Sequence, residues 1–262
     1  MTSRWRLIID DPASGAWNMA VDRAILEAHQ AGDVLPTLRL YRWNRPTVSL
    51  GRFQAAEDVD PETCAAGGID LCRRPTGGRG VLHDDEVTYS IVAGVRDGLP
   101  RGVSASYRTL CGALVEAYRE LGVSAELTAR RRGDRASGAC YLHATDADLS
   151  LGAAKLSGSA QVWSGSSCLQ HGSFVLSRDS AREASVFRLG VEGERALERD
   201  TSTIEAALGY RPQEPELTHR LVAGLASGLD AAFEPQMLSE PERAAAERLV
   251  DTFRIDEGMH KT

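Results

Sequence analysis

The side chains best suited to chemistry gather in the stretch RRPTGGRGVLHDDEVTYSIV. It opens with an arginine–glycine turn that contains Arg73, Arg74, Gly77, Gly78 and Arg79. Backbone N–H groups of a glycine-rich turn, together with guanidinium groups, can bind a phosphate or a carboxylate. The stretch is not G-x-G-x-x-G and lacks the GK[ST] of a P-loop. The alternative is that the glycines only supply the positive φ of a tight turn.

Four consecutive polar residues follow the glycines: His83, Asp84, Asp85 and Glu86. We expect their side chains to diverge, because successive residues of a strand point to opposite faces. A metal site needs ligands that converge on one point. We therefore predict no metal site and interpret the cluster as a polar turn.

Residues 155–163, KLSGSAQVW, carry a second set of reactive side chains. In a single strand, one face would hold Lys155, Ser157, Ser159 and Gln161. The opposite face would hold Leu156, Gly158, Ala160 and Val162, and small residues allow close approach of a ligand. The polar face suits either a ligand site or a solvated outer surface. Further on, LQHGSF contains a lone strand histidine, His171, for which the residues alone favour a structural role.

The composition is that of a globular protein, with 262 residues, 42% hydrophobic and 26% charged. The net charge of −7 argues against broad nucleic-acid binding, which needs a basic face. No apolar run approaches the ~18 residues of a membrane span, and the N-terminus does not resemble a signal peptide. We therefore expect a cytoplasmic protein. The five cysteines form no C-x-x-C pair, so we expect thiols, most of them buried, and no structural zinc.

The elements that must position these residues follow from periodicity and from turn residues. We expect strands at 4–10, 38–43, 47–51 and 69–74. A half-buried strand should begin at Glu86 and pair with residues 80–82 as a hairpin. Two or three strands are expected within 148–176, the last two joined by a turn at 163–167. We expect helices after an N-cap at Ser14, at 60–66, at 104–122 with one apolar stripe, and at 180–188, 201–208, 215–229 and 240–254. Residues 128–140 are expected to form a basic loop. The order predicts an α+β fold in one domain over 1–262, with a core to about 190 and a helical part from about 191.

Three motifs, RRPTGGRGVLHDDEVTYS, AKLSGSAQ and QHGSF, resemble in order and spacing the lipoate-protein ligase, octanoyltransferase and biotin ligase superfamily. The resemblance extends from the N-terminal strand to about residue 190. It implies a mixed β-sheet flanked by helices, with an acyl tunnel roofed by the arginine–glycine turn.

Two residue patterns separate the chemistries of this superfamily. Cys140 lies fifteen residues before Lys155, where octanoyltransferases of the Gram-positive type place a catalytic cysteine. Glu86 and Val87 stand where lipoate ligases usually carry Gly-Asn. The resemblance therefore implies an octanoyltransferase without a cofactor. An ATP- and magnesium-dependent lipoate ligase is the alternative, and a non-catalytic carrier-binding module is a further one.

The mechanism implied by the resemblance is a ping-pong acyl transfer through a Cys140 thioester. Octanoyl would come from acyl carrier protein and pass to a lysine of a lipoyl-domain protein, such as glycine cleavage H protein or a 2-oxoacid dehydrogenase E2. Lys155 would favour the thiolate, and His83 or Lys155 would deprotonate the acceptor lysine. The resemblance makes the remaining candidates substrate-binding: Arg73, Arg74, Gly77, Gly78, Arg79, His83, Ser157, Gly158, Ser159, Ala160 and His171. The basic residues at 73, 79 and 130–132 would meet the acidic carriers.

Overall fold

The computed structural model describes residues 2–127 and 148–255 and has a six-stranded sheet at its centre, in the order β10-β11-β6-β2-β1-β12. Strand β12 pairs parallel with β1, and β1 with β2, whereas the other neighbours are antiparallel. The strands of this sheet are β1 (Ser3–Ile9), β2 (Thr37–Tyr41), β6 (Glu86–Gly94), β10 (Ser159–Ser164), β11 (Ser167–Val175) and β12 (Ala231–Pro235). The mixed sheet flanked by helices confirms the predicted α+β class.

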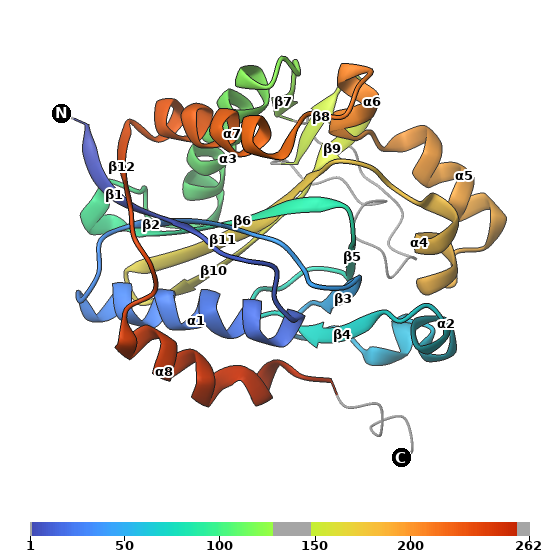
Figure 1. The fold of residues 1–262 in the computed structure, drawn as a ribbon, viewed down its shortest axis with the longest axis horizontal. Helices are drawn as coiled ribbons and strands as arrows, with labels where there is room; N and C mark the ends of the chain where they lie inside the picture. Colours follow the sequence, from blue (N-terminus) through green and yellow to red (C-terminus); the bar gives the residue numbers. More distant parts are fainter. Residues whose placement is uncertain (1, 128–147, 256–262) are drawn as a thin grey trace.

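Helices cover both faces of the central sheet (Figure 1). Helices α1 (Gly15–Ala31) and α8 (Glu240–Leu249) lie together on one face, and the 3-10 turn η4 (Val250–Phe253) extends α8. Helices α3 (Val103–Glu120) and α7 (Glu214–Leu229) pack against each other on the other face. The α3–α7 pair and the α1–α8 pair each pack against the sheet to form a separate apolar core.

Local signals in the sequence predicted α1 and α3 correctly. Ser14 is the N-cap of α1, where its hydroxyl accepts a hydrogen bond from the Trp17 N–H group, and Gly32 ends the helix in the left-handed region at φ 91°. In α3 the predicted apolar stripe is buried. These features depend on residues within one or two turns of each other, so they can be seen in the sequence.

A second, three-stranded sheet lies beside one end of the central sheet, in the order β4-β3-β5. It consists of β3 (Thr47–Leu50), β4 (Asp70–Arg73) and β5 (Val81–His83), next to the 3-10 turn η1 (Ala56–Asp58) and α2 (Pro61–Ala66). The predicted hairpin of 80–82 with the strand from Glu86 is wrong. Strand β5 pairs with β3 instead, because both edges of β6 are already taken by β2 and β11.

Strand β6 is buried along its whole length, so the prediction of a half-buried strand is also wrong. Its alternation of apolar and polar residues is real. The polar face, however, turns toward α1 rather than toward water, and its side chains join a buried polar network. Alternation alone does not distinguish a solvated face from a buried one whose groups are all hydrogen-bonded.

Residues 155–163 form two strands in different sheets rather than one. Strand β9 (Ala154–Ser157) belongs to a third sheet with β7 (Glu126–Leu127) and β8 (Leu149–Leu151), whereas β10 begins after a break at Gly158. The predicted two-faced strand is therefore wrong. The hairpin of β10 and β11 is confirmed, with Gly165 in the left-handed region at φ 59°.

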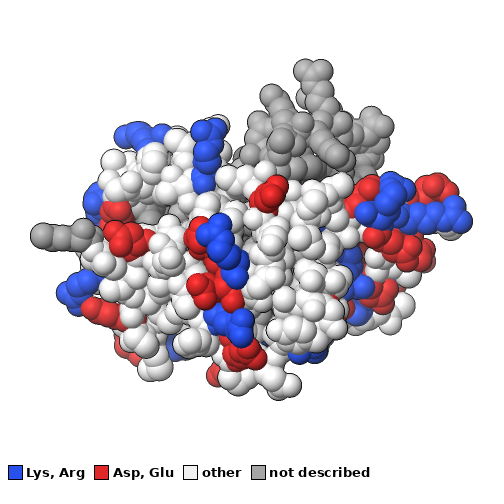
Figure 2. Space-filling view, turned by 90° about the horizontal axis from the view of Figure 1, so that it is seen from above, with Lys and Arg blue, Asp and Glu red and all other residues white. Residues whose placement is uncertain are grey.

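The C-terminal half contains two elements that the sequence did not predict. Helices α4 (Ser180–Val186) and α6 (Ile204–Leu208) match predictions, but α5 (Gly190–Asp200) and β12 were missed. Helix α5 buries only Leu197, so it has almost no apolar pattern. In the described ranges no helix is long and apolar enough to cross a membrane. Figure 2 shows acidic and basic side chains interleaved on the described part of one face.

Candidate active site

The candidate active site is a cleft between the central sheet and the β4-β3-β5 sheet. It is a narrow cleft of about 480 Å³ when its open mouth is counted, most of which is solvent outside the walls. Most of the predicted site residues that the structure describes line it together: Arg74, His83, Lys155, Gly158, Ser159, Ala160 and His171. Val81 lies beside them, and Met19 and Trp43 contribute apolar surface.

Lys155 is the only lysine among the described residues that line this cleft, and it is 5% exposed. Its Nζ forms a salt bridge with Asp148 Oδ2 at 2.9 Å, and Asp148 is 3% exposed. Gly158 lies directly against this pair, since a Cβ added there would sit 3.3 Å from Nζ. The Lys155 side chain folds back over position 158, where a glycine leaves room for it. The strand is interrupted at this glycine, between β9 and β10.

Arg74 shapes the arginine–glycine turn from inside. Its buried guanidinium donates to the carbonyl oxygens of Gly77 at 2.8 Å, Arg79 at 2.7 Å and Ser49 at 2.8 Å. Gly78 is in the left-handed region at φ 94°, which favours glycine. Arg74 also donates to the hydroxyls of Thr76 at 3.1 Å and Ser49 at 3.3 Å, so it fixes the backbone of the turn and the polar groups behind it together.

Arg73 supports the neighbouring loop. Its Nη1 donates to the carbonyl oxygens of Gly51 at 2.8 Å and of Gln54 at 2.7 Å. Gly51 in turn contacts the arginine–glycine turn so closely that an added Cβ would lie 1.9 Å from the Gly78 oxygen. The two loops are therefore packed against each other at the edge of the cleft.

His83 and Glu86 converge, contrary to the prediction that their side chains diverge. His83 Nδ1 lies 2.8 Å from Glu86 Oε1, and the imidazole stacks on Trp43 at 4.0 Å. Burial by itself raises the pKa of Glu86, but His83 and the hydroxyl donors of Thr88 and Ser173 outweigh it and leave that pKa lowered. Glu86 is therefore a buried carboxylate.

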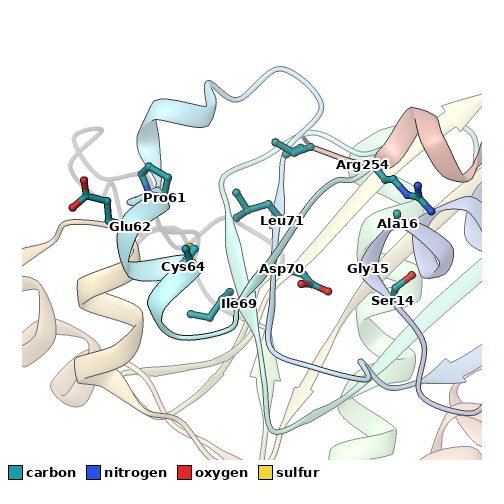
Figure 3. A pocket seen from close by; sticks show the side chains of 12 residues that line it. Ser14, Gly15, Ala16, Pro61, Glu62, Cys64, Ile69, Asp70, Leu71 and Arg254 are labelled. Carbon is teal, nitrogen blue, oxygen red and sulfur yellow. The ribbon is translucent and has the colours of Figure 1, made fainter. Parts of the chain in front are cut away.

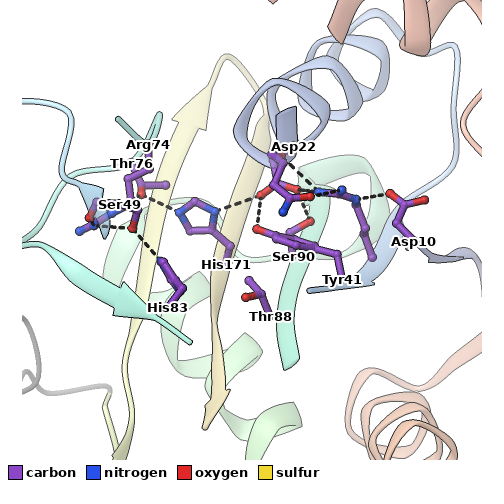
Figure 4. A network of polar contacts seen from close by, with 12 residues as sticks. Asp10, Asp22, Tyr41, Ser49, Arg74, Thr76, His83, Thr88, Ser90 and His171 are labelled. Atoms are coloured by element: carbon purple, nitrogen blue, oxygen red, sulfur yellow. Dashed lines mark hydrogen bonds and ion pairs between the residues drawn. The ribbon is translucent and has the colours of Figure 1, made fainter. Parts of the chain in front are cut away.

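His171 occupies an equivalent arrangement on β11. Its Nδ1 lies 3.1 Å from Asp22 Oδ2 on α1, and its Nε2 lies 2.7 Å from the Thr76 hydroxyl (Figure 4). Burial lowers the pKa of His171 despite the opposing effect of Asp22. Arg39 shares the Asp22 carboxylate at 2.8 Å. The structural role that the sequence favoured for this histidine fits these contacts, although its ring also lines the cleft.

The structure separates the other predicted residues from the cleft wall. Ser157 is buried and donates to the Ser173 carbonyl oxygen at 2.8 Å. Cys140 and the basic loop 128–140 lie outside the described residues. Asp84 and Asp85 bind Arg182 and Arg211, away from the cleft. In the ranges that the structure describes, no group of three or more His, Cys, Asp or Glu side chains could hold a metal ion.

Sequence reasoning missed Asp148 and Ser49 as site residues. Asp148 comes just before β8 and has no motif of its own. Ser49 lies in a strand of apolar character, and only the pairing of β3 with β5 brings it to His83. No local pattern marks either residue.

A second cavity lies between the N-terminus of α1, α2, β4 and the end of η4 (Figure 3). It is larger, about 1200 Å³ counting its mouth, yet none of the predicted residues line it. Its charged side chains are Glu62, Asp70 and Arg254. We place the site in the smaller cleft because the lysine, both histidines and the arginine meet there.

Comparison with known proteins identifies the class that this fold and cleft define. The family model described as the lipoyl protein ligase A/B catalytic domain matches residues 14–225, and the chain belongs to this family. Its similarity to curated octanoyltransferases over nearly the full chain shows an acyltransferase with octanoyltransferase activity, as predicted. It is 38% identical to octanoyltransferase LipM of Kyrpidia tusciae over 98% of both chains, and 38% identical to octanoyltransferase LipM of Symbiobacterium thermophilum over 96% of both.

Solved structures extend the comparison to the ligases. A lipoate-protein ligase A bound with ATP has a TM-score of 0.81 at 25% identity, covering 95% of this chain and 94% of that one. A putative lipoate protein ligase from T. acidophilum with bound lipoic acid has a TM-score of 0.77 at 25% identity, covering 96% of both. The predicted superfamily is confirmed.

Proposed function

We propose that the chain takes octanoyl from octanoyl-acyl carrier protein as a Cys140 thioester and passes it to a lysine of a lipoyl-domain protein. The acceptor can be glycine cleavage H protein or a 2-oxoacid dehydrogenase E2. The reaction needs neither ATP nor magnesium. Free, buried thiols in the described part of the chain fit a reducing compartment, and we place the reaction in the cytoplasm.

The observation that supports this proposal is the buried ion pair of Lys155 and Asp148 at the bend between β9 and β10. A fixed ammonium in a cleft of low polarity favours a nearby thiolate and stabilises the oxyanion that forms when a thiol ester is attacked. Val81 and Ala160 offer apolar surface to the acyl chain. We assign Cys140 the role of nucleophile and Lys155 that of its electrostatic partner.

The test is direct. The purified protein is incubated with octanoyl-acyl carrier protein and its intact mass is measured, with an octanoyl adduct expected on the wild type and none on Cys140→Ala. The adduct should then disappear when a lipoyl domain is added, while the domain gains one octanoyl group. Full transfer by Cys140→Ala would refute the thioester. Strict dependence on ATP and free lipoate would support the ligase alternative instead.

A further inference from the structure

Two chains of buried polar groups meet on Arg74, which donates to the hydroxyls of Ser49 and Thr76; Figure 4 shows the second chain and the Ser49–His83 part of the first. In the first chain, Glu86 accepts a hydrogen bond from His83 Nδ1, and His83 Nε2 lies 2.8 Å from the Ser49 hydroxyl. In the other, Asp22 holds His171, whose Nε2 reaches Thr76. Each chain has the order carboxylate, histidine, hydroxyl.

The donors in the first chain follow from the charges of its ends. A carboxylate only accepts, so His83 Nδ1 donates to Glu86 and, in the neutral imidazole, Nε2 carries a lone pair. Arg74 only donates, and its Nη1 lies 3.3 Å from the Ser49 oxygen. The Ser49 hydroxyl therefore accepts from Arg74 and donates its single proton to His83. A proton that reaches the Ser49 oxygen can displace this one onto His83.

The two chains differ in their access to the cleft. Ser49 and His83 both line it. In the second chain His171 lines the cleft, but Thr76 does not. Both hydroxyls are buried, with Ser49 1% and Thr76 0% exposed, but only the Ser49 hydroxyl end borders the cleft in which an acceptor amine would be placed.

We propose that Ser49, His83 and Glu86 form the relay that accepts the proton of the acceptor lysine. This proposal rests on the proposed function. The lysine nitrogen forms a bond to the octanoyl carbonyl carbon, and the C–S bond of the acyl-enzyme breaks with its electron pair left on sulfur. The surplus proton moves from nitrogen to the Ser49 oxygen as the Ser49 proton moves to His83 Nε2. The imidazolium is stabilised by Glu86 and releases the proton to solvent.

Lys155 is the weaker candidate for this base, because its Nζ already forms a buried ion pair with Asp148 at 2.9 Å. Among the described residues, the charged and titratable groups around His83 are Glu86 on β6, Glu183 on α4, His171 on β11, Lys155 in the same cleft and, through Ser49, Arg74. Of these, only Glu86 makes a hydrogen bond to the imidazole, so it is the group that orients the base.

The experiment separates the two half-reactions. Acyl-enzyme is prepared from octanoyl-acyl carrier protein, mixed with excess lipoyl domain, and followed by intact mass in single-turnover experiments from pH 6 to 9. Ser49→Ala should form the acyl-enzyme at the wild-type rate and transfer the acyl group about 10²-fold more slowly, the usual size of a general-base contribution. Ser49→Thr, which keeps the hydroxyl, should transfer at least ten-fold faster than Ser49→Ala.

Glu86→Gln provides a second measure that keeps the side-chain shape. It should shift the pH at which transfer reaches half its maximum, because the imidazole loses its carboxylate partner. Thr76→Val is the matched control in the second chain and should leave that midpoint unchanged. Wild-type transfer rates in both Ser49→Ala and Glu86→Gln, or equal losses in both half-reactions, would overturn the relay. Absence of any adduct on the wild type would instead refute the proposed function.

Discussion

Replacement of Asp148 by asparagine should strongly destabilise the protein, because it leaves the Lys155 charge buried without its carboxylate. At the observed 2.9 Å the attraction between the two charges is about 6 kcal/mol at an effective dielectric constant of ~20. Desolvation offsets part of this, and removal of one partner of a buried pair costs about 3–5 kcal/mol. We expect a loss near the lower limit, about 3 kcal/mol, because the asparagine oxygen still accepts a hydrogen bond.

A double-mutant cycle measures this coupling. For a chain of this size, about 3 kcal/mol corresponds to a fall in Tm of about 6–12 °C. Lys155→Met should cost a similar amount, since it leaves a buried carboxylate. The double variant should be no less stable than either single variant, which gives a coupling of about 3 kcal/mol or more. Urea unfolding followed by circular dichroism supplies the free energies.

The surface pair of Glu192 and Arg195 is the matched control. Its N–O distance is 2.8 Å, nearly that of the buried pair, but the side chains are 85% and 64% exposed. Glu192→Gln and Arg195→Met should therefore couple by less than about 0.5 kcal/mol. If Asp148→Asn and Lys155→Met each cost under about 1 kcal/mol and simply add, the pair does not carry the buried charge that we describe.

Three further predictions concern packing, pH and thiol reactivity. Gly112→Ala should stabilise α3 by about 1 kcal/mol, because the new methyl group meets open space. Gly224→Ala should instead destabilise the protein by about 1–3 kcal/mol, because its Cβ would lie 2.4 Å from a backbone atom of α3. Urea unfolding measures both free-energy changes. Burial lowers the pKa of His171, so the unfolded chain binds the proton more readily than the folded chain. The free energy of unfolding should therefore fall as the pH drops below about 6.5. In thermal melts at pH 5 to 7, His171→Gln should reduce this dependence of stability on pH. Burial raises the thiol pKa of the four described cysteines to about 11 or 12. Iodoacetamide at neutral pH should therefore alkylate Cys140 first, as measured by peptide mass mapping. Alkylation of a buried cysteine at the same rate would contradict this prediction.

The sequence predicted features that depend on neighbours along the chain. The Ser14 cap, the α3 stripe and the Gly165 turn each follow from residues a few positions apart. The errors concern partners that are distant in sequence. Strand β5 has the composition to pair with the strand that follows it, and only the full sheet order shows that both edges of β6 are occupied.

The same limit applies to the site. The sequence grouped Lys155 and the glycine pair through their motifs, but Asp148 and Ser49 have no motif. Asp148 meets the site through its ion pair with Lys155, and Ser49 reaches the cleft through the pairing of β3 with β5. His83 and Glu86 were interpreted as diverging strand neighbours. The actual turn at residues 84 and 85 brings these two side chains to the same side.

Glu86 connects the error in the fold to the chemistry. Burial of a carboxylate is costly, and Glu86 Oε1 accepts hydrogen bonds from Thr88 at 2.6 Å, Ser173 at 2.7 Å and His83 at 2.8 Å. If Glu86 had only a structural role, the two hydroxyl donors would be enough to meet the hydrogen-bonding needs of Oε1. The third donor is an imidazole that is stacked on Trp43 and opens to the cleft through Ser49, and a ring fixed at both nitrogens has one tautomer. Glu86 is thus the residue that defines which nitrogen of His83 can take a proton.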